Sequence, residues 1–157
     1  MERAIESEIA VAAPLDAVWD AWTTPEGVVT FFGPKARISL AIGGPYEIYF
    51  MPEAPVGFQG SEGCTVLSFL PKRIFSFSWN APPEFPEVRA ERTWVVLRFD
   101  PLGEAVTRVR LSHLGWKEGE PWQKARDYFV AAWQLVLHRL ARRFTHGPID
   151  WSDPWVP

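Results

Sequence analysis

The pattern of hydrophobic and polar residues changes its character near residue 120. Before that point, short alternating stretches are separated by Gly and Pro, which is typical of β-strands joined by turns. From Pro121 to Phe144, hydrophobic residues instead recur at three- and four-residue steps, the pattern of an amphipathic helix. This stripe consists of Trp122, Ala125, Phe129, Ala132, Trp133, Val136, Leu137, Leu140 and Phe144. Such a stripe has to be buried, and the preceding sheet offers a face for it.

The N-terminal part predicts one strand and two short helices. Residues Ile5 to Val11 alternate between apolar and polar positions, as a half-buried strand does. Pro14 suits the first turn of a helix, and a short apolar stripe runs from Leu15 to Trp22. Thr24-Pro25-Glu26 then predicts a second helix start, because it supplies a hydroxyl cap, a first-turn proline and a first-turn acid. Gly33-Pro34 ends this helix.

Six further alternating segments predict three hairpins. The pairs are 36–42 with 46–51, 63–70 with 73–79, and 93–99 with 106–114. Short connections between successive strands favour an antiparallel meander, and its twist would curl it around the long helix. The loop at 80–91 carries three prolines and is expected to be irregular. We therefore predict an α+β fold, in which a curved antiparallel sheet of about seven strands wraps around a long C-terminal helix.

Composition limits the classes of protein to consider. The 157 residues predict a single domain at 1–148 and a Trp- and Pro-rich tail at 149–157. A net charge of -3 argues against a nucleic-acid partner. We expect no signal peptide and no membrane span, because no apolar run is long enough. Cys64 is the single cysteine, which fits a reducing compartment, so a cytoplasmic location is expected.

Several segments resemble the helix-grip fold of the START and birch-pollen-allergen (SRPBCC) superfamily, and most closely its branch related to the activator of heat-shock protein 90 ATPase homologue. The resembling segments are 13–34, the Gly43-Gly44 turn, 63–80, 107–113 and 133–144. The resemblance implies the fold predicted above, with the long helix as one wall of a ligand cavity. It implies several functions, since the superfamily includes lipid and hormone carriers, polyketide cyclases and aromatases, and chaperone regulators.

Strand alternation predicts which side chains face the long helix. The inward rows are Tyr46, Ile48 and Phe50; Phe75, Phe77 and Trp79; Thr93, Val95, Leu97 and Phe99; and Val109, Leu111 and His113. They should oppose Phe129, Trp133 and Val136 of the helix. These aromatic rows would line a cavity for a flat or lipid-like molecule, or they would simply fill the core. The pattern leaves both interpretations open.

His113 is the polar exception in these rows. It would orient a ligand or exchange protons with it, or it is a hydrogen-bonded core histidine, which is the more common case. No Ser or Cys completes a nucleophile–base pair with it, and the spacing to His138 and His146 does not suit a metal site. We therefore predict no catalytic residue, no metal ligand and no cofactor.

The function predicted from these observations is the binding of a hydrophobic or aromatic small molecule between sheet and helix. The expected lining residues are Trp79, Thr93, His113, Phe129 and Trp133. One alternative is an interaction module that binds a heat-shock protein 90 chaperone. A second is a cyclase- or aromatase-like enzyme that uses His113 as its acid–base group.

The tail has two interpretations of its own. Trp151 and Trp155 are costly to leave in water, so they either fold back over the domain or meet another subunit in a homodimer. The first needs no partner and is favoured.

Overall fold

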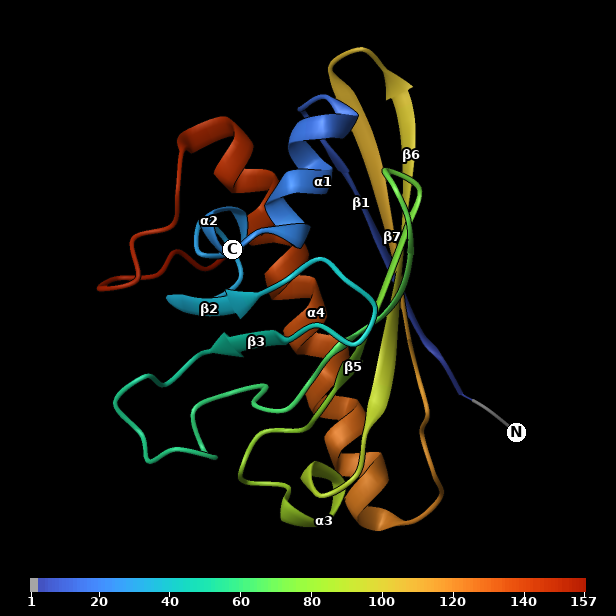
Figure 1. Ribbon diagram of the computed structural model, residues 1–157, viewed down its shortest axis with the longest axis vertical. Helices are drawn as coiled ribbons and strands as arrows, with labels where there is room; N and C mark the ends of the chain where they lie inside the picture. Colours follow the sequence, from blue (N-terminus) through green and yellow to red (C-terminus); the bar gives the residue numbers. More distant parts are fainter. Residues whose placement is uncertain (1–2) are drawn as a thin grey trace.

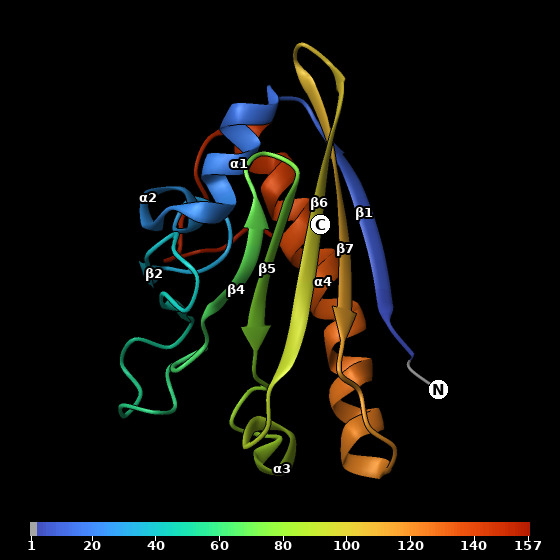
Figure 2. The ribbon, with the colours of Figure 1, turned by 45° about the vertical axis from the view of Figure 1, so that its right-hand side comes forward.

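A five-stranded antiparallel sheet lies against one long helix in the structure, a computed structural model that describes residues 3–157 (Figures 1 and 2). The strand order is β1-β7-β6-β5-β4. The bounds of these strands are β1 Ile5–Val11, β4 Val66–Leu70, β5 Ile74–Trp79, β6 Thr93–Gly103 and β7 Val106–Leu114. A separate two-stranded sheet pairs β2, Lys35–Ile38, with β3, Tyr46–Tyr49. The predicted α+β helix-grip arrangement is confirmed.

The predicted helices form where their start signals lie. Helix α1 spans Leu15–Thr23, α2 spans Pro25–Val28 and α4 spans Glu120–His146. The Thr24 hydroxyl caps α2 by accepting a hydrogen bond from the Gly27 N–H at 3.0 Å. A further short helix, α3 at Pro86–Arg89, lies in the loop expected to be irregular. Pro86 lies in the first turn of α3, where the N–H that proline lacks has no partner in the helix, so it favours a helix start at this position.

The seven strands divide into two sheets because the seam between β3 and β4 is irregular. Two isolated bridges, Pro45 with Thr65 and Tyr49 with Gly60, and single backbone hydrogen bonds such as Tyr46 N–H to the Cys64 carbonyl at 2.8 Å join the two sides without a regular ladder. Pro45 has no N–H to donate, and the Ile48 N–H donates to the Ser61 hydroxyl at 2.8 Å instead of to a strand. A Cβ on Gly60 would lie 1.9 Å from the Ile48 carbonyl oxygen, so this close approach requires glycine.

The helix stripe packs as its periodicity predicts. Its buried members are Trp122, Ala125, Phe129, Trp133, Leu137 and Leu140. The rings of Trp133 and Trp79 lie 5.8 Å apart, and those of Phe129 and His113 lie 4.9 Å apart. The expectation that Phe129 and Trp133 look toward Trp79 and His113 is therefore confirmed. Over residues 3–157, no helix combines the length and apolar character needed to cross a bilayer.

Candidate ligand-binding pocket

An open pocket of about 600 Å³ lies beside α4. One face of the helix forms its longest wall, through Tyr128, Phe129, Ala132, Trp133, Leu135, Val136 and Arg139. Four other parts of the chain complete it: the connection after α2, the loop at 50–60, the segment from Trp79 to Glu84 with Arg89, and the tail at 151–154. The volume lies within the range of about 300–1,000 Å³ that is usual for ligand sites.

Closely packed aromatic rings form the floor of the pocket. The Phe32 ring lies 5.5 Å from Trp79 and 5.8 Å from Trp133. Phe129 stacks on Trp133 at 6.1 Å with an interplanar angle of 23°. All four side chains are nearly inaccessible to water. Because each ring is held by its neighbours, the floor is preformed and does not have to be assembled around a ligand.

The rim, by contrast, exposes hydrophobic side chains. Phe50, Met51 and Phe58 are 40%, 63% and 55% exposed, and all three line the pocket. Apolar groups clustered around a concavity are typical of a surface that something else covers.

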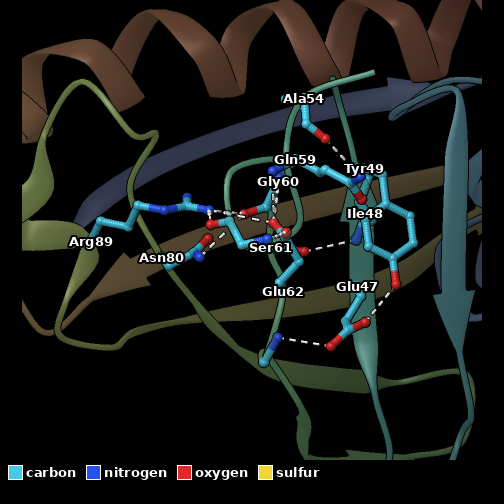
Figure 3. A network of polar contacts seen from close by, with 12 residues as sticks. Glu47, Ile48, Tyr49, Ala54, Gln59, Gly60, Ser61, Glu62, Asn80 and Arg89 are labelled. Atoms are coloured by element: carbon cyan, nitrogen blue, oxygen red, sulfur yellow. Dashed lines mark hydrogen bonds and ion pairs between the residues drawn. The ribbon is translucent and has the colours of Figure 1, made fainter. Parts of the chain in front are cut away.

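The loop that carries this rim is fixed by partly buried hydrogen bonds and an ion pair (Figure 3). The Glu62 carboxylate accepts hydrogen bonds from the N–H groups of Gly57, Gln59 and Gly60, the last two at 3.0 and 2.7 Å. Arg89 of α3 donates to the carbonyls of Gly57 and Gly60 at 2.7 and 2.9 Å, and it lies 3.4 Å from Glu62. A third bond joins Arg89 to the Ala81 carbonyl at 2.7 Å. These contacts tie the rim loop to the opposite wall.

Sequence reasoning missed this pair. In the same loop the Gln59 side-chain amide donates to the carbonyls of Pro52 and Ala54 at 3.2 and 2.9 Å. The available signal is the clustering of Gly57, Gly60 and Gly63 around an acid, since such glycines mark close backbone approaches.

Three of the five residues predicted to line the site, Trp79, Phe129 and Trp133, do face the pocket. Thr93 and His113 are buried and stand outside its lining. The structure connects them to the lining residues through a chain of hydrogen bonds.

This chain begins at the helix. The Trp133 indole N–H donates to Nδ1 of His113 at 2.9 Å. Because Nδ1 accepts, the neutral ring carries its proton on Nε2, which donates to the Thr93 hydroxyl at 2.7 Å. The Thr93 hydroxyl in turn donates to the Trp79 carbonyl at 3.3 Å. Both ring nitrogens of His113 are therefore used in positioning the two tryptophans of the floor.

His113 is held in its neutral form. Burial, with a smaller contribution from the Arg126 charge, lowers the pKa of His113 to about 3. A second proton on Nδ1 would face the Trp133 N–H, so two donors would oppose each other. With no free ring nitrogen and no contact with the pocket, His113 lacks the geometry of an acid–base catalyst.

The tail folds back over the protein. The Trp151 indole N–H donates to the Val29 carbonyl at 2.6 Å, and the Ile149 N–H donates to the Thr30 carbonyl at 2.9 Å. Arg139 of α4 donates to the Trp155 carbonyl at 2.9 Å. The favoured interpretation of the tail is confirmed, and the fold-back brings Trp151 into the pocket wall.

We predict a pH dependence of stability that originates at His113. Between pH 6.5 and 3 the unfolded histidine binds a proton that the folded one does not, so stability falls as pH falls through this window. The loss is up to about 1.4 kcal/mol per pH unit. Urea unfolding at pH 7 and pH 5 should show a smaller loss for His113→Gln than for the wild type. Equal losses in the two proteins would contradict the prediction.

A second prediction concerns the tail. Trp151→Ala removes one hydrogen bond and a partly buried ring, so it should lower the free energy of unfolding by about 1–2 kcal/mol. Deletion of 149–157 should lower the melting temperature further without changing the mass measured by light scattering. Val156→Ala, at a side chain that is 62% exposed, is the matched control and should be neutral. A deletion that changes the oligomeric state but not the melting temperature would place the tail between subunits instead.

Comparisons with known proteins now identify the family. A model of the family Activator of Hsp90 ATPase homolog 1-like protein matches residues 12–145. Comparison with curated proteins finds no match.

Solved structures share the fold at low identity. Protein MLL2253 from Mesorhizobium loti is 21% identical with a TM-score of 0.71, covering 89% of this chain and 95% of its own. CalU16 from Micromonospora echinospora is 24% identical with a TM-score of 0.67, covering 95% and 78%. The Aha1 dimer from Colwellia psychrerythraea is 17% identical with a TM-score of 0.67, covering 92% and 98%. Because the family model spans most of the sequence, the chain belongs to the Activator of Hsp90 ATPase homolog 1-like protein family.

Proposed function

We propose that this protein binds a hydrophobic small molecule in the pocket beside α4. The observation that carries the proposal is the combination of a preformed aromatic floor with an exposed apolar rim around about 600 Å³ of space. Trp79 and Trp133 are themselves nearly inaccessible to water, so a ligand would lie above this aromatic layer, against the partly exposed Ala132 and Val136 of α4. A ligand on this floor would also cover the rim side chains.

The architecture supports binding without large rearrangement. The floor is fixed by ring packing and by the hydrogen bonds that run from Trp133 to Trp79 through His113 and Thr93. The rim loop is fixed by Glu62 and Arg89. Preformed walls lower the entropy that binding costs, because few side chains have to be ordered with the ligand. In this proposal Thr93 and His113 support the lining residues and do not themselves touch the ligand.

The proposal predicts that filling the pocket abolishes binding. Ala132 lines the pocket, and the neighbouring Ala131 is exposed on α4 outside it. Ala132→Phe should weaken the binding of Nile red, a neutral hydrophobic dye, by at least about tenfold, because the new ring occupies the ligand's space. Ala131→Phe adds the same ring to the same helix and should leave the affinity unchanged.

Fluorescence titration gives the two affinities, and thermal unfolding checks that both variants fold. Native mass spectrometry of the protein as purified would show whether it retains a ligand from the cell. If the wild type binds neither Nile red nor any co-purified molecule, or if both variants bind equally well, the proposal fails.

A second candidate function follows from the family match at residues 12–145. A chaperone partner would be a heat-shock protein 90, and the protein would act by changing its ATPase rate. Adding the protein in excess to such a chaperone should then change ATP hydrolysis measurably, whereas an unrelated protein of similar charge should not. An unchanged rate at saturating concentration would exclude this role.

The enzymatic alternative has no comparable support. It required a polar partner for His113 inside the cavity, but His113 and its partner Thr93 both lie outside the lining. We therefore propose no catalytic residue.

A further inference from the structure

The pocket has two cationic side chains in its lining, and they differ in how completely they are paired. Arg89 donates to three backbone carbonyls and faces Glu62, so its charge and its donors are already used. Arg139 makes one hydrogen bond, from Nε to the Trp155 carbonyl at 2.9 Å. The two terminal nitrogens of Arg139 have no hydrogen-bond or ion-pair partner among residues 3–157.

The tail holds the Arg139 guanidinium in place at the pocket wall. Its Nε is tied to Trp155, and its charge lies 5.5 Å from the centre of the Trp151 ring. With Nε occupied, the terminal nitrogens are the donors left for a ligand. Arg139 is partly buried, and this burial lowers the pKa of its guanidinium. A cation that is partly desolvated and short of acceptors favours an anion beside it.

The charges along the pocket are also separated. The carboxylate in the pocket lining is Glu84. Burial raises the pKa of the Tyr128 hydroxyl, and the nearby negative charge of Glu84 raises it further. Tyr128 and Arg139 are eleven residues apart on α4, which corresponds to about 16 Å along the helix axis. One end of the pocket therefore carries a negative charge and the other a positive one, with Trp133 and Val136 between them.

We propose that the ligand is an apolar molecule bearing one carboxylate, with its body against Ala132 and Val136 above the aromatic floor and its carboxylate on the terminal nitrogens of Arg139. This inference rests on the proposed function and adds the chemical class and orientation of the ligand. Arg139 acts as a specificity residue, and the tail, through Trp151 and Trp155, positions it. An aromatic acid and a fatty acid share this chemistry.

The test compares each acid with its neutral ester. Calorimetric titration would use naphthoate with methyl naphthoate, and decanoate with methyl decanoate, as aromatic and aliphatic pairs. A charge-assisted hydrogen bond predicts that the preferred acid binds at least about tenfold more tightly than its ester. The pair that shows the larger preference identifies the body of the ligand as aromatic or aliphatic.

Arg139→Gln should remove this preference by weakening the acid about tenfold and leaving the ester unchanged. Lys124→Gln is the matched control: Lys124 is an exposed cation on the same helix and lies outside the pocket lining, so the preference should persist. Raising the salt concentration should weaken only the acids.

The outcomes separate this inference from the proposed function. Esters that bind the wild type as tightly as the acids would overturn the carboxylate assignment while the hydrophobic pocket stands. A preference that survives in Arg139→Gln would overturn the role of Arg139. If neither acids, esters nor Nile red bind, the proposed function fails as well.

Discussion

The indole N–H of Trp133 is the group on which the arrangement of helix and sheet depends. Trp133 is almost completely buried, so its donor needs an acceptor inside the protein, and His113 supplies it. That acceptor exists only while His113 is neutral, and the same burial that hides Trp133 keeps it neutral. Packing and protonation state are thus coupled at one contact between α4 and β7. The hydrogen bonds continue through Thr93 to Trp79, so four elements share one polar chain within an aromatic core.

This contact also fixes the rotation of α4 about its axis, and the rotation determines what the pocket contains. With Trp133 directed at His113, the preceding residue, Ala132, and Val136, one turn later, border the open space. The helix therefore contributes two adjacent surfaces, one that closes the core and one that remains available. The sequence suggests His113 as a ligand contact. In the structure it lies behind the pocket lining and holds Trp133 of the floor in place by a hydrogen bond.

Periodicity predicts the parts of this structure that repeat. The strand β1, the long α4 and the inward rows through Phe99 and Leu111 all follow from residue spacing, because burial selects one face of each element. The pairing of Glu62 with Arg89 does not follow from periodicity, since it joins two irregular segments 27 residues apart; the glycines near Glu62 indicate a close backbone approach but do not name Arg89 as the partner. The division into two sheets is missed for a related reason: it depends on local contacts in an irregular segment, among them the Ser61 hydroxyl that replaces a ladder bond at Ile48. The presence of a cavity stays open at the level of sequence, because a filled core and a lined pocket require the same aromatic residues.

The tail shows why the family alone leaves function open. The family match ends at residue 145, yet Trp151 and Pro154 form part of the pocket wall and the Trp155 carbonyl holds Arg139. The floor belongs to the shared fold, whereas this wall and the orientation of its cation come from residues beyond the match. Relatives with the same sheet and helix but a different C-terminal segment would thus present a pocket of different shape and charge. Ligand preference in such a protein has to be derived from the residues that close the pocket, since the fold determines the position of the pocket but not the chemistry of its walls.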